Sequence, residues 1–304
     1  MWYWTKVLFL ILLGAVGVWL LYEVVTFPNI GKLRTENPVT SSMIEYRLAN
    51  FPKKKSDLES DIKNAESELQ TIGNTTKVAR SDEKIKRIIE LQLTIEKQKN
   101  ELQEMGDQPK KNMIWQPIEQ ISPNLQKAVL AGEDARFFEH TGFDWEAIQG
   151  AWDEAVREGE KEAKAEGDYD PNDWIPPLPN FKRGASTITQ QLAKNLYLSE
   201  DRNFLRKGRE AAITYFLERE LSKKRILEIY LNVIEWGDGI YGAEAAARIY
   251  FKKSASSLTP QEAAYLSAMI PSPLNVFNPK KNPKRVVRRQ KAILRGLSSV
   301  KLVY

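Results

Sequence analysis

Alternation of apolar and polar residues at every second position, the pattern of a half-buried strand, is nearly absent from this chain. Helix start signals recur instead: Thr187 precedes Gln190 by three residues, as in a capping box, and Thr259 precedes Pro260 at a first helical position. With 304 residues, of which 42% are hydrophobic, the chain can build one sizeable core or two modest domains. The sequence therefore predicts a mainly α-helical globular protein with further segments outside its core.

Residues 7–22 form an uncharged apolar run that is just long enough to span a bilayer. The sequence that follows it, LLYEVVTFP, contains no small-x-small cleavage site, which favours an uncleaved anchor over a signal peptide. Basic residues on both sides signal the orientation only weakly. We expect a single-pass transmembrane anchor at residues 1–26 and a membrane-proximal segment at residues 27–51.

The composition then changes to charged, helix-forming residues, with eleven basic and eleven acidic side chains in residues 52–105. Apolar residues follow a four-three spacing in two stretches that a Gly73-Asn74 break separates. The first stretch is Leu58, Ile62, Ala65, Leu69 and Ile72, and the second is Ile85, Ile88, Ile95 and Leu102, with Gln92 and Lys99 in the gaps. We expect an antiparallel, coiled-coil-like helical hairpin at residues 52–106, which serves as a spacer or as a docking arm for a partner.

The chain has no cysteine and a single histidine, His140. These counts exclude disulfides, thiol nucleophiles, the usual Ser-His-Asp triads and histidine-rich metal sites. Any acid-base chemistry must therefore depend on carboxylates.

One carboxylate interrupts an apolar helical stripe at the start of residues 133–142 (EDARFFEHTG). Leu125, Val129, Glu133 and Phe137 lie four residues apart, so a helix through them would half bury Glu133. Burial disfavours the charged carboxylate and raises its pKa toward the working pH of a proton-transfer catalyst. The structural alternative is that Glu133 pairs with Arg136 or caps the next turn.

A polar helical face is predicted in residues 184–195 (GASTITQQLAKN). A helix that begins after Thr187 groups Gln190, Gln191, Lys194 and Asn195 on one sector. Such a surface suits a hydroxyl-rich or phosphorylated ligand, and an ordinary solvent face is an equal alternative.

A second acid, Glu210, lies three residues before Ile213 on another apolar stripe and is preceded by several cations. These cations are Arg202, Arg206, Lys207 and Arg209. A buried acid among cations is expected to stay ionised. The structural alternative is a helical ion pair between Arg206 and Glu210, whereas clustered cations indicate a phosphate or pyrophosphate ligand.

The remaining charge is unevenly distributed. Residues 145–175 hold ten acidic and three basic residues, beginning with a predicted helix whose stripe is Trp145, Ile148, Trp152 and Ala155. A proline-rich loop at residues 170–182 follows, as a lid, a membrane-facing lip or a plain connector.

Residues 280–304 hold nine basic and no acidic residues. The apolar stripe of this last helix is Val286, Val287, Gln290, Ile293 and Leu297. The stripe predicts a helix that packs on the core, with a basic outer face suited to anionic lipid rather than to nucleic acid.

Five motifs in order give the chain a resemblance to the peptidoglycan glycosyltransferases (glycosyltransferase family 51), in particular the monofunctional biosynthetic type without a transpeptidase domain. Beside residues 133–142 and 184–195, the matching runs are RKGRE at 206–210, RILEIYLNVIEWGDGIYGAEAAARIYF at 225–251 and LTPQEAAYLSAMIPSP at 258–273. The resemblance implies a lysozyme-like helical transglycosylase domain, here residues 107–304. It also implies a bacterial enzyme outside the cytoplasmic membrane that polymerises the lipid-linked disaccharide lipid II with inversion and releases polyprenyl pyrophosphate.

By this resemblance, Glu133 is the general base on the acceptor hydroxyl and Glu210 assists at the donor side. The implied donor-site ligands are Ser186, Gln190, Gln191, Lys194 and Asn195, and the implied pyrophosphate partners are Arg202, Lys207 and Arg209. A divalent cation, Mg²⁺ or Mn²⁺, occurs in parts of the family, but this sequence contains no dedicated ligand set.

Two stretches depart from the family pattern, namely the hairpin and the long link at residues 153–182. Both leave partners open, including cell-wall synthesis proteins that dock on the hairpin. Two other functions also remain: a glycan hydrolase, for which the cation cluster is unnecessary, and a membrane-anchored scaffold.

Overall fold

The computed structural model describes residues 23–74, 82–166, 186–198 and 204–303, together with scattered positions between residues 4 and 21. The chain is mainly helical, which confirms the predicted class. Arg202 and the proline-rich loop at residues 170–182 lie outside the described residues, as do most positions of the expected membrane anchor. Within the described part of the chain, no helix is both long enough and apolar enough to cross a membrane.

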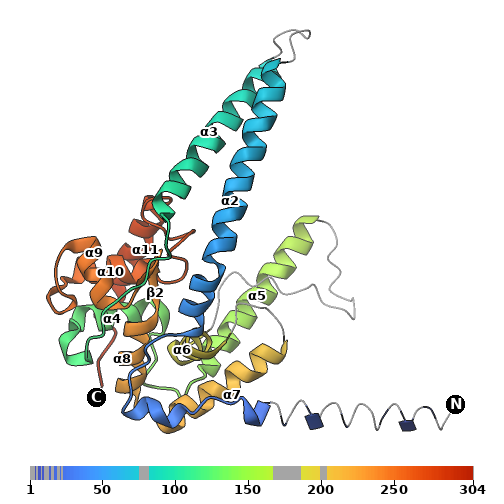
Figure 1. Cartoon of the computed structure of the whole chain (residues 1–304). Helices are drawn as coiled ribbons and strands as arrows, with labels where there is room; N and C mark the ends of the chain where they lie inside the picture. The colour runs from blue at the N-terminus through green and yellow to red at the C-terminus, as the bar shows by residue number, and fades with distance from the viewer. Residues whose placement is uncertain are drawn as a thin grey trace.

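Two long helices, α2 (Ser42–Asn74) and α3 (Asp82–Met105), lie side by side and project from the remainder of the molecule (Figure 1). Helix α2 begins ten residues before the expected boundary at Pro52, which lies inside the helix. The helices are cross-linked along their length by ion pairs, among them Arg87 to Glu68 at 2.8 Å and Lys99 to Glu66 at 2.6 Å. The base of the hairpin is held by Lys55, whose Nζ lies 2.9 Å from Asp107 Oδ1.

The seam between these helices differs from the predicted spacing on the second helix. Ile95 is buried as predicted, and so is Leu91, which was not predicted, whereas Ile85 is 44% exposed. The buried face of α3 therefore passes through Leu91 and not Gln92. The prediction was wrong there because two overlapping sets of isoleucines and leucines fit a heptad spacing, and only packing against α2 selects between them.

Helix α4 (Pro123–Glu133) packs in the core against both α10 (Pro260–Met269) and α11 (Pro283–Gly296), which also pack against each other. Ser122 caps it by accepting a hydrogen bond from the Asn124 N–H at 3.2 Å. Gly132 lets α10 approach, because a Cβ atom at this position would lie 2.8 Å from Ser267 Oγ. The helix ends at Glu133, so Phe137 is reached through turns rather than along the helix, although it is fully buried.

Helix α5 (Trp145–Glu166) extends outward from the core, ending near Gly167 as expected (Figure 1). Its predicted stripe is only partly buried: Ala155 is inaccessible, but Trp145 and Trp152 are 71% and 54% exposed. The remaining helices of the core are α6 (Ile188–Tyr197), α7 (Phe204–Glu220), α8 (Lys223–Val233) and α9 (Ala243–Phe251). Helix α6 packs against both α7 and α8, which fixes the position of its polar face.

A small sheet packs against α9 and α10. Its strands are β1 (Asn112–Met113), β2 (Glu235–Gly237) and β3 (Ile240–Tyr241), with β3 in the middle. Strand β3 pairs parallel to β1 and antiparallel to β2, where the register shifts by a bulge. Short 3-10 helices complete the fold at Ile30–Arg34 (η1), Ile118–Gln120 (η2) and Ala255–Ser257 (η3).

Candidate active site

A cleft of about 910 Å³ opens beside the C-terminal end of α4. It is bounded by α6, α7, β2, the base of α2 and the segment between α10 and α11. The predicted site residues that line it are Glu133, Ser186, Gln190, Gln191, Lys194, Asn195 and Glu210. The fold thus brings together side chains from three separate sequence motifs.

Glu133 is held in this cleft by donors on both carboxylate oxygens. Arg289 Nη2 lies 2.8 Å from Oε1, and Gln191 Nε2 donates to Oε2 at 3.0 Å. The Glu133 side chain is only 8% exposed, and this burial raises the pKa of its carboxyl group against the smaller opposing effects of Arg289 and Gln191. The alternative pairing with Arg136 is wrong, since that guanidinium binds Asp144 and Glu146.

A buried tyrosine completes the network on the side of α8. Tyr230 is inaccessible to solvent, and its hydroxyl donates to Gln191 Oε1 at 2.7 Å. Burial and the nearby charge of Glu133 raise the pKa of the Tyr230 hydroxyl well above its usual value. The hydroxyl therefore remains a hydrogen-bond donor throughout the physiological pH range.

The polar face of α6 forms one wall of the cleft. Thr187 and Gln190 make the predicted capping box, in which Gln190 Oε1 accepts from the Thr187 N–H at 3.0 Å. Gln190 and Asn195 are each only 6% exposed, so the alternative of an ordinary solvent face does not fit them. Within the described residues, the buried Oδ1 of Asn195 has no hydrogen-bond donor, and the exposed Lys194 ammonium has no ion-pair partner. Both groups can serve a ligand in the cleft.

Glu210 lies on the opposite wall, 3% exposed, on the buried face of α7 with Ile213 as predicted. Arg206 Nη1 donates to its Oε2 at 3.2 Å, and Lys207 Nζ donates to its Oε1. Neither Lys207 nor Arg209 lines the cleft itself, and Arg209 makes its contacts elsewhere. Its guanidinium binds the Glu23 carboxylate and donates to the Thr26 carbonyl at 2.7 Å, which ties α7 to the last residues of the expected anchor.

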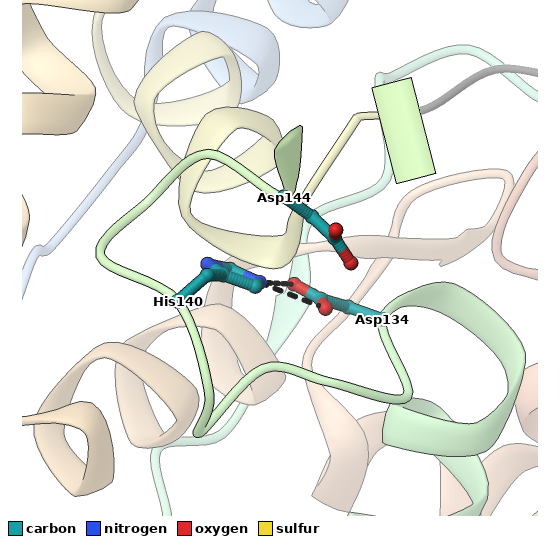
Figure 2. A group of neighbouring side chains, drawn as sticks. All are labelled: Asp134, His140 and Asp144. Carbon is teal, nitrogen blue, oxygen red and sulfur yellow. Dashed lines mark hydrogen bonds and ion pairs between the residues drawn. The ribbon is translucent and has the colours of Figure 1, made fainter. Parts of the chain in front are cut away.

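The loop after Glu133 couples α4 to α6. Asp134 accepts a hydrogen bond from His140 Nε2 at 3.0 Å (Figure 2). It also accepts one from the Ile188 N–H, at the start of α6, at 3.0 Å. The Gly142 N–H donates to His140 Nδ1 at 3.2 Å, so the ring hydrogen resides on Nε2 and points at Asp134. These bonds hold Glu133 at a fixed position relative to the polar face of α6.

Asp134, His140 and Asp144 also have ligand atoms within 4.8 Å of one another, as a metal site would require (Figure 2). Asp144, however, pairs with Arg136 and accepts from the Ala147 N–H at 2.8 Å as the cap of α5. Each of the three side chains thus has a structural partner, and none of them lines the cleft. The chemistry of this set does not fit a catalytic Mg²⁺ or Mn²⁺ ion, for which ligands facing the substrate are needed.

Among the charged residues that line the cleft, three were missed from the sequence, namely Arg289, Arg47 and Glu235. Arg47 at the base of α2 places Nη2 3.2 Å from Glu235 Oε2 on β2. Arg289 lies three residues after Val286 and four before Ile293, which are both buried, and this spacing could have shown that it faces inward. The predicted stripe instead included Val287, which is 40% exposed.

A model of the transglycosylase family matches residues 98–167 and 178–298, leaving most of the hairpin outside the match. A biosynthetic peptidoglycan transglycosylase of Thiobacillus denitrificans is 54% identical over 159 residues, which cover 52% of this chain and 60% of that protein. Relatives of the same description from a Janthinobacterium species and from Neisseria gonorrhoeae are 43% identical over 201 residues and 46% identical over 188. These alignments cover 66% and 62% of this chain, and 78% and 72% of the relatives. The chain therefore belongs to the transglycosylase family and is a glycosyltransferase.

Proposed function

We propose that this enzyme polymerises lipid II into the glycan strands of peptidoglycan and releases polyprenyl pyrophosphate. The relatives described as biosynthetic peptidoglycan transglycosylases support the reaction class. The observation that carries the proposal is the Glu133 carboxylate, buried at the wall of a large polar cleft with a raised pKa.

Glu133 is suited to be the general base. A base is most effective when its pKa approaches the working pH, and burial raises that of Glu133 from its usual range. Arg289 and Gln191 oppose this shift, so that the carboxylate is still available in its ionised form. A base of this kind removes the proton of a sugar hydroxyl more effectively than a solvent-exposed glutamate, whose lower pKa makes it a weaker base.

The reaction proceeds in one displacement. Glu133 removes the proton from the acceptor hydroxyl, whose oxygen forms a bond to the anomeric carbon of the donor. The bond from that carbon to the pyrophosphate oxygen breaks, and its electron pair leaves with the polyprenyl pyrophosphate. Attack from the opposite face inverts the anomeric centre, and Glu133 then passes its proton to solvent.

The departing pyrophosphate needs positive charge on the donor side of the cleft. Lys194 on α6 is exposed to the cleft, while Arg206 and Lys207 are gathered around Glu210 on α7. In the proposed mechanism, Glu210 orients these cations and Lys194 binds a phosphate oxygen. Ser186, Gln190 and Asn195 then supply neutral partners for the sugar hydroxyl and amide groups.

The same proposal includes the expected membrane anchor, a single catalytic domain without a transpeptidase domain, and an extracytoplasmic location. The contact of Arg209 with Glu23 and Thr26 supports it, because it joins helix α7 to the last residues of the expected anchor. Such a link would keep the cleft close to a lipid-linked substrate. We propose that the hairpin supplies a docking arm for cell-wall synthesis proteins and that any divalent ion enters with the pyrophosphate.

The test is strand synthesis from labelled lipid-linked disaccharide by the wild type, by Glu133→Gln and by Glu139→Gln. Glu139 belongs to the same motif but is exposed outside the cleft, so its variant is the matched control. We expect polymer from the wild type and the control, and none from Glu133→Gln. Polymer formation by folded Glu133→Gln at the wild-type rate would rule out the proposed base.

A further inference from the structure

Gln191 lies between two groups of different hydrogen-bonding capacity. Its Nε2 faces Glu133 Oε2 at 3.0 Å, and its Oε1 faces the Tyr230 hydroxyl at 2.7 Å. An ionised carboxylate can only accept, so the amide NH₂ group must face Glu133. The Oε1 atom then faces Tyr230, whose hydroxyl has to be the donor.

We propose that Tyr230 is a positioning residue for the base: its hydroxyl holds the Gln191 carboxamide with the NH₂ group directed at Glu133. This inference rests on the proposed role of Glu133. Tyr230 itself is fully buried in α8 and does not line the cleft, so it acts on the reaction only through Gln191.

The orientation of this amide matters because it discriminates between the two protonation states of Glu133. The NH₂ group stabilises the ionised carboxylate, whereas a reversed amide would present Oε1 and accept a hydrogen bond from the protonated carboxyl group. Donation from Tyr230 to Oε1 disfavours the reversed orientation. Without that hydroxyl the amide can turn as Glu133 titrates, which would favour the protonated form and weaken the base at neutral pH.

The structural alternative is that Tyr230 only packs in the core and that its buried hydroxyl needs a hydrogen-bond partner. Tyr250 offers a matched control for that alternative. Tyr250 lies on α9, its hydroxyl donates to the Trp236 carbonyl on β2 at 3.1 Å, and neither residue lines the cleft. Tyr230→Phe and Tyr250→Phe each remove one hydroxyl hydrogen bond while leaving the ring in place, but only the first lies beside Gln191.

The experiment is the pH dependence of kcat/KM for strand synthesis, whose acidic limb reports the ionisation of the base in the free enzyme. For Tyr230→Phe we expect this limb to move to higher pH by about 0.5–1 unit, the loss on the plateau to stay below about tenfold, and KM to be nearly unchanged. For Tyr250→Phe we expect no movement of the limb. An unmoved limb in Tyr230→Phe, or the same movement in both variants, would overturn the proposal.

A second comparison removes the Tyr230 hydroxyl from an enzyme that already lacks the Gln191 amide. Gln191→Met removes the amide, so the Tyr230 hydroxyl loses the hydrogen-bond acceptor that it has among the described residues. Removal of the hydroxyl should then change neither kcat nor the acidic limb. A further loss in Gln191→Met/Tyr230→Phe relative to Gln191→Met would show that Tyr230 acts by another route. Glu133→Gln in the same assay separates the two claims, because its activity bears on the base, whereas the tyrosine variants bear on how the base is held.

Discussion

Arg289 on the last helix and Glu133 at the end of α4 are 156 residues apart in sequence, and their side chains meet with 2.8 Å between Nη2 and Oε1. The same Nη2 donates to the Gly132 carbonyl at 2.8 Å, which fixes the guanidinium against the helix that ends at the base. Arg289 is thus a fixed positive charge beside a buried acid, and it limits how far burial can raise the pKa of that acid.

Replacing Arg289 with Gln should weaken the base. Loss of the neighbouring charge raises the pKa of Glu133 further, because burial then acts with less opposition. We expect the acidic limb of kcat/KM to shift to higher pH, and activity at neutral pH to fall roughly ten- to a hundredfold, as for the loss of a charge-assisted hydrogen bond. Arg288→Gln, a change at an exposed neighbour, is the control; equal profiles for both variants would contradict this role of Arg289.

The sequence was informative where a site residue depends on local spacing. Glu133 and Glu210 interrupt apolar stripes within single helices, and the structure places both on buried faces. Local spacing can show that Arg289 faces inward, but it cannot show that Arg289 meets Glu133 or that Tyr230 meets Gln191, because these contacts join helices far apart in the sequence. Arg209 was expected to be a pyrophosphate partner and is close in sequence to Glu210. Its side chain nevertheless faces Glu23 instead of the cleft.

The burial of Glu133 also predicts a pH-dependent effect on stability. Its pKa is raised in the folded state from 4.5, so above about pH 4.5 the folded protein retains a proton that the unfolded chain has released. The free energy of unfolding of the wild type should therefore fall as pH rises through this window, by at most about 1.4 kcal/mol per pH unit from this group. Glu133→Gln has no titrating group at this position, so its free energy of unfolding lacks this pH-dependent contribution.

The measurement is urea unfolding of the wild type and Glu133→Gln at several pH values. We expect the variant to gain stability relative to the wild type as pH rises from about 4.5, and the difference to become constant once Glu133 is ionised in the folded state. A difference that is independent of pH, or that changes in the opposite direction, would show that the folded-state pKa of Glu133 is not raised.

Gly142 is required for the turn that joins Glu133 to α6. Its φ is +92°, and a Cβ atom there would lie 2.8 Å from Thr214 Cγ2. Its carbonyl also accepts a hydrogen bond from Thr187 Oγ1 at 2.7 Å, at the N-cap of α6. Gly142→Ala should therefore lower the free energy of unfolding by about 1–3 kcal/mol and reduce activity by displacing the polar face of α6.

Gly150 provides the comparison for that substitution. It lies within α5, and a Cβ atom there meets nothing within 4 Å, so Gly150→Ala should stabilise the protein by about 0.5–1 kcal/mol through helix propensity. Urea unfolding of both variants and strand synthesis by each provide the check. Similar stabilities for the two alanine variants would refute the steric requirement at Gly142.

The hairpin separates into a base that contributes to the cleft and an outer part that does not. Met43 and Arg47 near the start of α2 line the cleft, and Lys280 ties the segment before α11 to Glu104 near the end of α3, with Nζ 2.8 Å from Oε1. Deleting the whole of residues 52–105 would disturb this base. A sharper variant replaces residues 66–91 with a short glycine-serine turn, keeping Ile62, Ile95 and the ion pair of Lys55 with Asp107.

This shortened protein should synthesise strands from detergent-solubilised lipid-linked disaccharide with kcat/KM within about twofold of the wild type, a change below 0.5 kcal/mol in activation free energy. Arg47→Gln in the full-length chain is the contrasting variant. It leaves the outer hairpin intact but removes a cation from the cleft and leaves the buried Glu235 carboxylate without the Arg47 contact, so we expect a rise in KM. Loss of activity in a folded, shortened protein, with Arg47→Gln unaffected, would place the catalytic contribution of the hairpin in its outer part.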